Sequence, residues 1–481
     1  MTHIIAVSDW RSQPIDDLYT ILETVEPTPD LLLYAGDDLS RFKNADTDTD
    51  HLAELARLTK HQQSLYVRGN DDFPPSTGPQ FDSEFTTDLH RTPYTYEDLV
   101  FIGQEGSTQG PGLINYTEDD VQRHLFEQRT ACEDRTPILV THTPPFGILD
   151  IGKRFGQQHI GSKAVRSFID DIQPPVIVCG HCHQFGGRAE PLEYGTVINI
   201  ASHDGVDDPG RYALITIDAS NESIEYEFYD TRHLLGSRLT DLVQVGRNRV
   251  EQFSELGITN PDEITEERRA ELEALPGASS WHVDRWIVHR QAFENDEVVI
   301  LNKSAFDDLH DTEPLLLDIE TDLQQDRIWL VGTYSYQNDT YRQFFDPDDE
   351  SALLQELSEY LNEHGSEPII YYGGNYFDEQ CLSRRFDEHG ITEGIDHLER
   401  AHDLGITAQQ ELFGPFNRHK LDVVASALGF EYQDPTVDGF VVGSKYTRYL
   451  LDGEEPDWDR LKQYNNDDVT ALKTIVDHIR S

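Results

Sequence analysis

Short apolar runs recur along the first 230 residues, and each of the earliest ones leads into a polar residue. They are short and rich in Val, Ile and Leu, which predicts strands that are buried on both faces. The first five cover residues 4–7, 31–35, 65–67, 138–140 and 176–178. Three later runs predict further strands of the same domain, at residues 196–200, 213–217 and 224–228. Because the strands of such a sheet end at a common edge, we expect the polar residues after them to gather there.

The residue types at these strand ends are those of metal ligands. In chain order they are Asp9, Asp37, Asn70, His142, His181 and His183. Carboxylate, amide and imidazole groups together suit Mn²⁺, Fe²⁺, Zn²⁺ or Mg²⁺. An aspartate shared by two ions could hold them about 3.5–4 Å apart, a spacing that activates water and clamps a phosphoryl group.

This ordered series resembles the calcineurin-like metallophosphoesterases, whose segments read D-x-H, G-D, G-N-H-[DE], H and G-H-x-H. The resemblance covers about residues 1–230 and implies an α/β sandwich with two divalent ions, Mn²⁺ or else Fe²⁺ or Zn²⁺. The ligands that it implies are Asp9 and His183 for the first ion, Asn70, His142 and His181 for the second, and Asp37 as the bridge.

Two positions depart from the family pattern. Arg11 stands where the family has a histidine ligand, and a guanidinium has no lone pair to offer a metal. The first ion therefore lacks a ligand, so that either water replaces it or the ion binds weakly. Asp71 stands where the family has a histidine that assists the leaving group; it could donate a proton only if burial or Asp72 raised its pKa. The alternative is a domain that keeps the fold with feeble catalysis.

A second acidic constellation lies in the last third of the chain. Residues 315–321 form an apolar run that ends in D-x-E-T, which predicts a strand with Asp318 and Glu320 on one face. Further strands are expected at 328–334, 341–345 and 369–372, and the last leads into Asn375 and Asp378. Tyr464 and Asp468 are spaced i and i+4, so a helix would place them on one face.

Together these motifs resemble the DEDDy 3′–5′ exonucleases of the ribonuclease-H-like fold, over about residues 313–481. The resemblance implies two Mg²⁺ or Mn²⁺ ions, with Tyr464 orienting the attacking water and Asn375 contacting substrate. Asp467 is an alternative to Asp468, although it would break the spacing from Tyr464. The ligands that it implies are Asp318, Glu320, Asp378 and Asp468.

Residues 233–312 separate the two patterns. Apolar positions between 242 and 256 predict two short helices around Gly246, which resembles a helix-hairpin-helix that offers backbone N–H groups to a phosphate. Gly246, Arg247 and Arg249 are the expected nucleic-acid contacts. The alternative is that this segment only packs or links.

Composition adds a constraint on the environment. The 481 residues carry 90 Asp and Glu against 38 Lys and Arg, of which only nine are Lys, for a net charge of −52. Such acid-rich, lysine-poor chains resemble proteins of salt-accumulating archaea, where salt screens the repulsion. No basic patch marks a nucleic-acid site, but in concentrated salt such a patch contributes little.

These observations predict an α/β multidomain enzyme with a phosphoesterase at 1–232, a connector at 233–312 and an exonuclease at 313–481. We expect it to be cytoplasmic, with no membrane segment, and to act on a DNA or RNA 3′ end or another phosphoester. Two alternatives stay open. One is a small-molecule phosphodiesterase or phosphatase with a non-catalytic C-terminal domain, and the other is a nucleic-acid-binding protein without catalysis.

Overall fold

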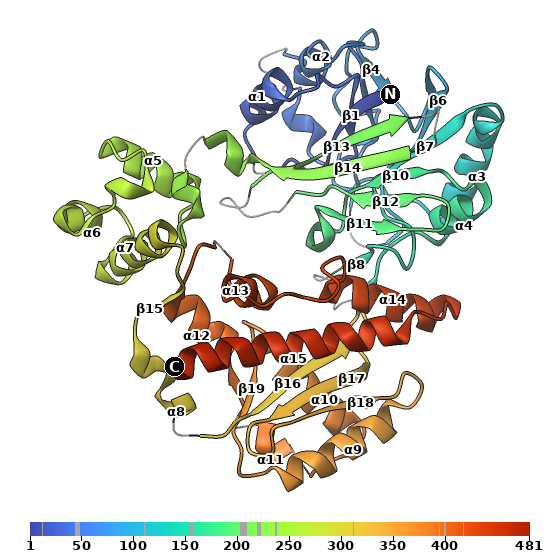
Figure 1. Cartoon of the computed structure of the whole chain (residues 1–481). Coiled ribbons are helices and arrows are strands. Elements are labelled where there is room, and N and C mark those ends of the chain that lie inside the picture. The colour runs from blue at the N-terminus through green and yellow to red at the C-terminus, as the bar shows by residue number, and fades with distance from the viewer. Residues whose placement is uncertain are drawn as a thin grey trace. The chain divides into compact units, whose positions relative to one another are not determined.

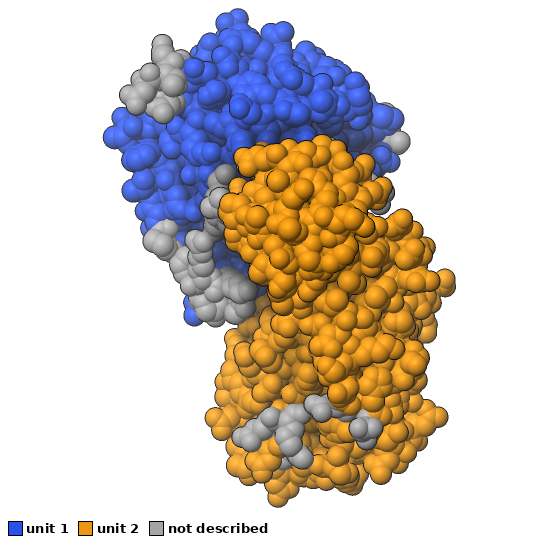
Figure 2. Space-filling view, turned by 90° about the vertical axis from the view of Figure 1, so that its left-hand side faces the viewer, with its two compact units in different colours: residues 1–236 blue, residues 237–481 orange. Residues whose placement is uncertain are grey.

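The computed structural model describes the chain except for residues 12, 44–48, 110–111, 153–157, 203–208, 219–222, 236–237, 311, 394, 399–400 and 417. The chain divides into two compact units, residues 1–236 and residues 237–481, coloured blue and orange in Figure 2. Each unit has its own β-sheets and its own hydrophobic cores. Among the described residues, no helix is both long enough and apolar enough to span a membrane.

Two six-stranded sheets form the first unit (Figure 1). The first sheet has the order β14-β13-β1-β2-β3-β4, with strands β1 Thr2–Val7, β2 Leu31–Tyr34, β3 Ser64–Tyr66, β4 Thr86–Asp88, β13 Arg211–Asp218 and β14 Ser223–Asp230. The second has the order β11-β12-β10-β7-β6-β5, with strands β5 Tyr94–Tyr96, β6 Leu99–Gln104, β7 Thr136–Thr141, β10 Val176–Cys179, β11 Arg188–Pro191 and β12 Thr196–Asn199. A separate ribbon pairs β8 Ile151–Gly152 with β9 Gln158–His159.

The two sheets pack face to face, and side-chain alternation along the strands determines which core each residue enters. In β1, Ile4 and Ala6 join the core between the sheets, together with Ile138 of β7. Ile5 and Val7 point the other way, into a second core. That core is shared with the helices α1 Ile15–Thr24 and α2 His51–Ala56; the unit's other helices are α3 Glu118–Gln128 and α4 Lys163–Ile172. The predicted α/β sandwich is confirmed.

The second unit is built on a five-stranded sheet of order β18-β17-β16-β19-β20. Its strands are β16 Leu315–Thr321, β17 Ile328–Ser335, β18 Thr340–Phe345, β19 Ile369–Tyr371 and β20 His402–Asp403. The first three are antiparallel, whereas β19 runs parallel to β16 and β20 runs parallel to β19. Away from this sheet, β15 Val299–Ile300 pairs with β21 Leu412–Phe413.

Helices cover both faces of this sheet (Figure 1). Leu315, Leu317 and Ile319 pack against one set of helices, while Leu316 faces the long helix α15. By the same alternation, Asp318 and Glu320 lie on the α15 side. The helices are α8 Asp307–His310, α9 Glu350–Glu363, α10 Phe377–Glu388, α11 Ile395–Leu398, α12 Leu404–Glu411, α13 Leu421–Ala427, α14 Gly439–Asp452 and α15 Trp458–Arg480.

The segment before this sheet contains the helices α5 Arg247–Glu255, α6 Arg269–Glu273 and α7 Ser280–Asn295. Gly246 is the N-cap of α5, as expected for the second helix of the predicted hairpin. The first expected helix is only a 3₁₀ turn, Arg238–Asp241. Gln244 has a left-handed φ of 56°, which ends any helix before Gly246.

Candidate functional site

The first candidate site lies where β1, β2, β3, β7 and β10 end, and its backbone is unusual there. Asp9, Asp37 and His181 all have left-handed φ angles, of 53°, 64° and 64°. Such conformations are costly for residues other than glycine, and they cluster at functional sites. Gly180 must be a glycine because a Cβ there would lie 2.1 Å from Ser8 Oγ and 2.5 Å from Asp9 Oδ2. The chain therefore turns sharply to bring these side chains together.

Four candidate metal ligands, each just after a different strand, lie close enough together to bind one divalent ion. The His142 Nδ1–H group donates to the Ala35 carbonyl oxygen at 2.8 Å, which leaves the Nε2 lone pair in the neutral ring for a ligand. That Nε2 atom faces Asn70 Oδ1 at 3.0 Å and Asp37 Oδ2 at 3.6 Å. A nitrogen lone pair that faces oxygen atoms in this way is stabilised by a cation bound between them.

His181 completes this set. Its Nε2 atom is buried and has no hydrogen-bond partner among the described residues, which is costly unless a ligand is bound. Burial, together with the neighbouring His142, lowers the pKa of His181 to about 3, so the ring is neutral as a metal ligand must be. The donors expected for the second ion, namely Asp37, Asn70, His142 and His181, thus fit a Mn²⁺, Fe²⁺ or Zn²⁺ ion.

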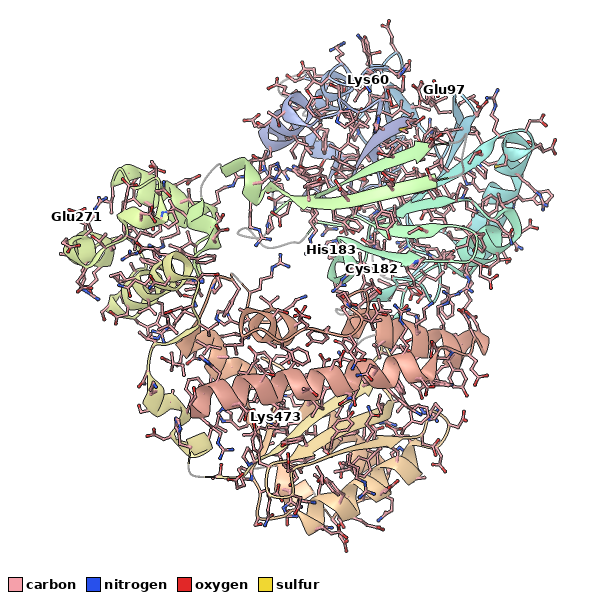
Figure 3. The ribbon with its side chains drawn as sticks, in the orientation of Figure 1. Lys60, Glu97, Cys182, His183, Glu271 and Lys473 are labelled. Atoms are coloured by element: carbon pink, nitrogen blue, oxygen red, sulfur yellow. The ribbon has the colours of Figure 1, made fainter. Side chains whose placement is uncertain are left out.

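The residues expected around the first ion are arranged differently. His183 Nε2 lies 2.9 Å from Asp9 Oδ1, and Ser8 Oγ donates to Asp9 Oδ2 at 2.6 Å. Figure 3 shows His183 beside Cys182, on the loop that follows β10. Burial alone would raise the pKa of Asp9, but the charge and hydrogen bond of His183 outweigh it and hold that pKa below its usual range.

Arg11 occupies the place of the missing histidine and lies among carboxylates. Its Nη2 atom donates to Asp37 Oδ2 at 2.5 Å and to Asp71 Oδ2 at 2.6 Å, and Nε lies 3.3 Å from Asp38 Oδ2. Asp71 is therefore an ion-pair partner with a side chain that is 47% exposed, not the buried acid that proton donation would need. Ligand atoms of Asp9, Asp37 and His142 lie within 4.8 Å of one another. The donor set for a first ion is nevertheless incomplete, because Arg11 supplies no lone pair and donates to the Asp37 oxygen that also faces His142.

Asp72 is a functional residue that the motif analysis did not assign. It accepts hydrogen bonds from the backbone N–H groups of Asp37, Leu39 and Gly69, at 3.0, 2.8 and 2.8 Å. Burial and the charge of Asp37 raise the pKa of Asp72 to about 7. Asp72 therefore ties the Asp37 turn to the Asn70 turn, and the burial needed to recognise this role is invisible in a sequence full of aspartates.

The second candidate site gathers carboxylates on the α15 side of the second unit's sheet. Asp318 and Glu320 of β16 and Asp468 of α15 have ligand oxygens that all lie within 4.8 Å of one another. Asp378 lies in the first turn of α10 and is buried, and its charge acts on both Asp318 and Glu320. All four residues of the predicted set are thus brought together from three separate elements.

Burial and mutual repulsion favour the protonated form of these carboxyl groups when no cation is bound. Burial and then the neighbouring carboxylates raise the pKa values of Asp318 and Glu320 well above their ordinary range. Burial raises the pKa of Asp378 and that of Asp468 to about 7. Oxygen-only donors at this spacing suit Mg²⁺ or Mn²⁺, and bound ions would restore the ionised form.

Helix α15 contributes more to this site than Asp468. The Asn465 Nδ2 atom donates to Asp318 Oδ2 at 2.7 Å, and a Cβ on Gly332 would lie 2.3 Å from Asn465 Oδ1. Tyr464 also faces Asp468; burial and that carboxylate raise its pKa, so its hydroxyl stays protonated. Asp467 accepts instead from the Gln433 backbone N–H at 2.8 Å, which favours Asp468 as the ligand.

Asp403 holds the loop that leads to Asp378. Its two carboxylate oxygens accept backbone N–H groups from four consecutive residues, Gly373, Gly374, Asn375 and Tyr376, at 2.8–3.1 Å. The Asn375 Oδ1 atom accepts from the Phe377 N–H at 3.2 Å. This predicted substrate contact thus has a structural role at the start of α10.

The expected phosphate contacts of the connector lie at the start of α5. Gly246 is the N-cap, and Arg247 and Arg249 are in the first turn. The Arg249 guanidinium lies 5.0 Å from the ring centre of Trp286, and its Nη1 atom donates to Gln252 Oε1 at 2.6 Å. Arg249 is therefore engaged within its own unit, and phosphate binding at this helix stays a prediction.

Comparison with known families agrees with the two expected domain types. Residues 2–185 match the family model of the calcineurin-like phosphoesterases, and residues 315–480 match that of the RNase H superfamily. The chain joins a calcineurin-like phosphoesterase domain to an RNase H superfamily domain. The two domains point to a metal-dependent hydrolase that acts on phosphoester bonds.

Similar proteins match parts of this two-domain chain. An uncharacterized protein of Methanocaldococcus jannaschii is 28% identical over 165 residues, which are 32% of this chain and 70% of that protein. A UPF0046 protein of Caenorhabditis elegans is 26% identical over 188 residues, which are 36% of this chain and 63% of that protein. A crystal structure of a Thermus thermophilus protein aligns with 48% of this chain and 99% of its own, at 18% identity and a TM-score of 0.34.

Proposed function

We propose that the RNase H superfamily domain is a 3′–5′ exonuclease that removes nucleotides from a DNA or RNA end. The phosphoesterase domain hydrolyses a second phosphoester, and the chain serves nucleic-acid processing or repair. The proposal combines the domain types with the residues at the two sites. It assigns metal-assisted hydrolysis to both domains.

The arrangement of four carboxylates is the observation that supports the exonuclease proposal most strongly. Asp318, Glu320, Asp378 and Asp468 come from β16, α10 and α15, and they are buried or half-buried side by side. Buried carboxylates that lie close together raise one another's pKa and cost folding free energy. Such clusters are therefore typical of functional sites. Two divalent ions would relieve the repulsion and bind a phosphodiester, and that is the chemistry they would supply.

The remaining side chains position the reactants. Tyr464 keeps its hydroxyl proton because burial and Asp468 raise its pKa, so it can donate to or orient a water molecule. Asn465 fixes the Asp318 carboxylate through its 2.7 Å hydrogen bond. Neither residue has to change its charge during the reaction, and their contribution is orientation.

In the phosphoesterase domain, the set Asp37, Asn70, His142 and His181 would hold one ion, and that ion would supply water activation and polarisation of the phosphoryl oxygen. The Ala35 carbonyl fixes the tautomer of His142 through Nδ1. Asp72 keeps the Asp37 and Asn70 turns in register. We propose a phosphodiester or phosphomonoester substrate.

The exonuclease proposal is tested on the full chain with 5′-labelled single strands of DNA and of RNA, in molar KCl with Mn²⁺ or Mg²⁺. We expect a ladder that shortens from the 3′ end. Asp468→Asn should abolish it, because a neutral amide binds a divalent cation far more weakly than a carboxylate does. The loss should be at least about a thousandfold, as expected when an essential group is removed.

Asp467→Asn is the matched control. It makes the same change one residue away on the same helix, and an amide oxygen can still accept from the Gln433 N–H. We expect its ladder to match that of the unaltered chain. A ladder that persists in Asp468→Asn, or that disappears only in Asp467→Asn, contradicts the proposed ligand set.

A further inference from the structure

The Arg11 side chain is half-buried against the bridging aspartate of the phosphoesterase site. Its Nη2 atom lies 2.5 Å from Asp37 Oδ2, and only 25% of the side chain is exposed. Asp38 adds a third carboxylate at 3.3 Å from Nε. A guanidinium held by several carboxylates is fixed in position, because rotation into solvent would break several charge-assisted hydrogen bonds.

The two residues that depart from the family pattern contact each other. Arg11 Nη2 lies 2.6 Å from Asp71 Oδ2, although the residues are 60 positions apart. The Asp71 backbone N–H also donates to Asp37 Oδ1 at 2.9 Å. One substitution thus supplies a cation and the other supplies its counter-charge, so the pair forms a single structural unit around Asp37.

The Arg11 guanidinium is a fixed cation beside the bridging aspartate. Arg11 brings a permanent positive charge to Asp37 Oδ2, where an ion shared between two sites would otherwise bind. It cannot ligate an ion, because a guanidinium has no lone pair, and it repels a cation placed beside it. Of the donors expected for that ion, Asp9 and His183 are left, with ligand atoms 2.9 Å apart, and two protein donors are fewer than the three that an open metal site has.

We infer that the phosphoesterase domain is a one-ion site in which the Arg11 guanidinium takes the place of the first metal ion. The inference rests on the proposed phosphoesterase function, because it concerns the same site. The ion held by Asn70, His142 and His181 stays, with Asp37 as a ligand to that ion alone. Arg11 then offers a fixed positive charge to a phosphoryl oxygen without any dependence on a second ion.

The test is the number of Mn²⁺ ions bound per chain. The full chain carries Asp318→Asn and Asp468→Asn, so that the exonuclease site adds no ions to the count. Equilibrium dialysis with metal analysis should give one Mn²⁺ ion for this chain. Adding Arg11→His should give two ions and the low-temperature electron paramagnetic resonance signal of a coupled Mn²⁺ pair, because an imidazole restores the missing ligand.

Arg11→Lys is the control variant, because it keeps a positive charge and donates no lone pair while it is protonated. It should bind one ion, with no coupled signal. Two ions in the chain with Arg11 intact overturn the inference, whether or not the variants fold. A single ion in a folded Arg11→His chain also overturns it. No bound ion in any of these proteins contradicts the proposed phosphoesterase function itself.

Discussion

At the scale of single residues, Tyr432 extends the exonuclease site beyond its four carboxylates. The Tyr432 hydroxyl donates to Asp468 Oδ1 at 2.8 Å, and its ring stacks on that of Tyr464 with centres 6.4 Å apart. Burial, followed by the charge of Asp468, raises the pKa of Tyr432 and keeps the hydroxyl protonated. Tyr432 therefore fixes which oxygen of Asp468 is left for a metal ion.

Replacing Tyr432 by Phe should slow the exonuclease about 10- to 100-fold, since a hydrogen bond to a charged group contributes about 1.5–3 kcal/mol. The variant should also need a higher Mg²⁺ concentration for half-maximal rate, because Asp468 is less well oriented. The measurement is the rate of ladder formation across a Mg²⁺ titration.

Tyr336→Phe is the control for this change. Tyr336 donates to Asp477 Oδ1 at 2.7 Å, so the variant breaks the same kind of contact near the C-terminal end of α15. Its rate and Mg²⁺ dependence should be those of the unaltered chain. An equal Mg²⁺ dependence in Tyr432→Phe would show that Tyr432 serves folding alone.

The candidate metal ligands of each site could be predicted from the sequence, whereas the residues that hold those ligands in position could not. Asp9 and His142 could be proposed from the sequence because each follows an apolar run, and Asp318 because it lies within one. Tyr432 and Asp403 could not, since their roles arise from contacts 36 and 27 or more positions away. No local pattern marks such a contact in a chain with 90 acidic residues.

At the scale of elements, α7 is joined to the RNase H superfamily domain through the buried His289. Its Nδ1 atom accepts the Val243 backbone N–H at 2.8 Å, so its Nε2–H group donates to the carbonyls of Phe416 at 2.7 Å and Gly414 at 3.1 Å. This arrangement requires the neutral ring. Burial accordingly lowers the pKa of His289 from its ordinary 6.5 to about 4.

Acidification should therefore destabilise this unit through His289. Between about pH 6.5 and pH 4, His289 is protonated in the unfolded chain but stays neutral in the folded protein. The free energy of unfolding therefore falls as the pH falls. The loss is on the order of 3 kcal/mol. It can be measured by urea unfolding in molar KCl at several pH values across that window.

His289→Gln should be less stable at pH 7 but should lose much less stability on acidification, because glutamine takes up no proton. His310→Gln changes an exposed histidine of the same unit and should keep the pH dependence of the unaltered chain. If His289→Gln loses as much stability as the unaltered chain between pH 6.5 and pH 4, the proposed role of His289 is wrong.

The strands could be predicted more reliably than the connector. Runs such as 138–140 and 315–317 are apolar throughout, and both lie in buried strands. The segment 239–246 has apolar residues at helical spacing, but the left-handed φ of Gln244 leaves only a short 3₁₀ turn. Such a turn depends on packing that hydrophobic spacing alone does not encode.

At the scale of the whole molecule, two domains with hydrolytic folds share one very acidic chain. The charge of −52 is spread over both units and exceeds what either metal site requires. We propose that concentrated salt screens this charge in the cell, as the composition suggests. Substrate recognition would then rest on metal ions and hydrogen bonds more than on a basic surface.

We propose that the chain contains two separate metal-dependent hydrolytic centres. It is tested most directly by assaying the full chain, Asp318→Asn, His181→Asn and the double variant on two substrates with Mn²⁺ in molar KCl. The substrates are a 5′-labelled oligonucleotide and bis-p-nitrophenyl phosphate, whose hydrolysis needs no nucleic-acid end.

We predict that Asp318→Asn abolishes 3′ shortening and leaves most of the hydrolysis of the small diester. His181→Asn should do the reverse, because it removes a ligand of the phosphoesterase ion only, and the double variant should lose both activities. Loss of both activities in one single variant, or survival of either in the double variant, would contradict the assignment of two independent centres.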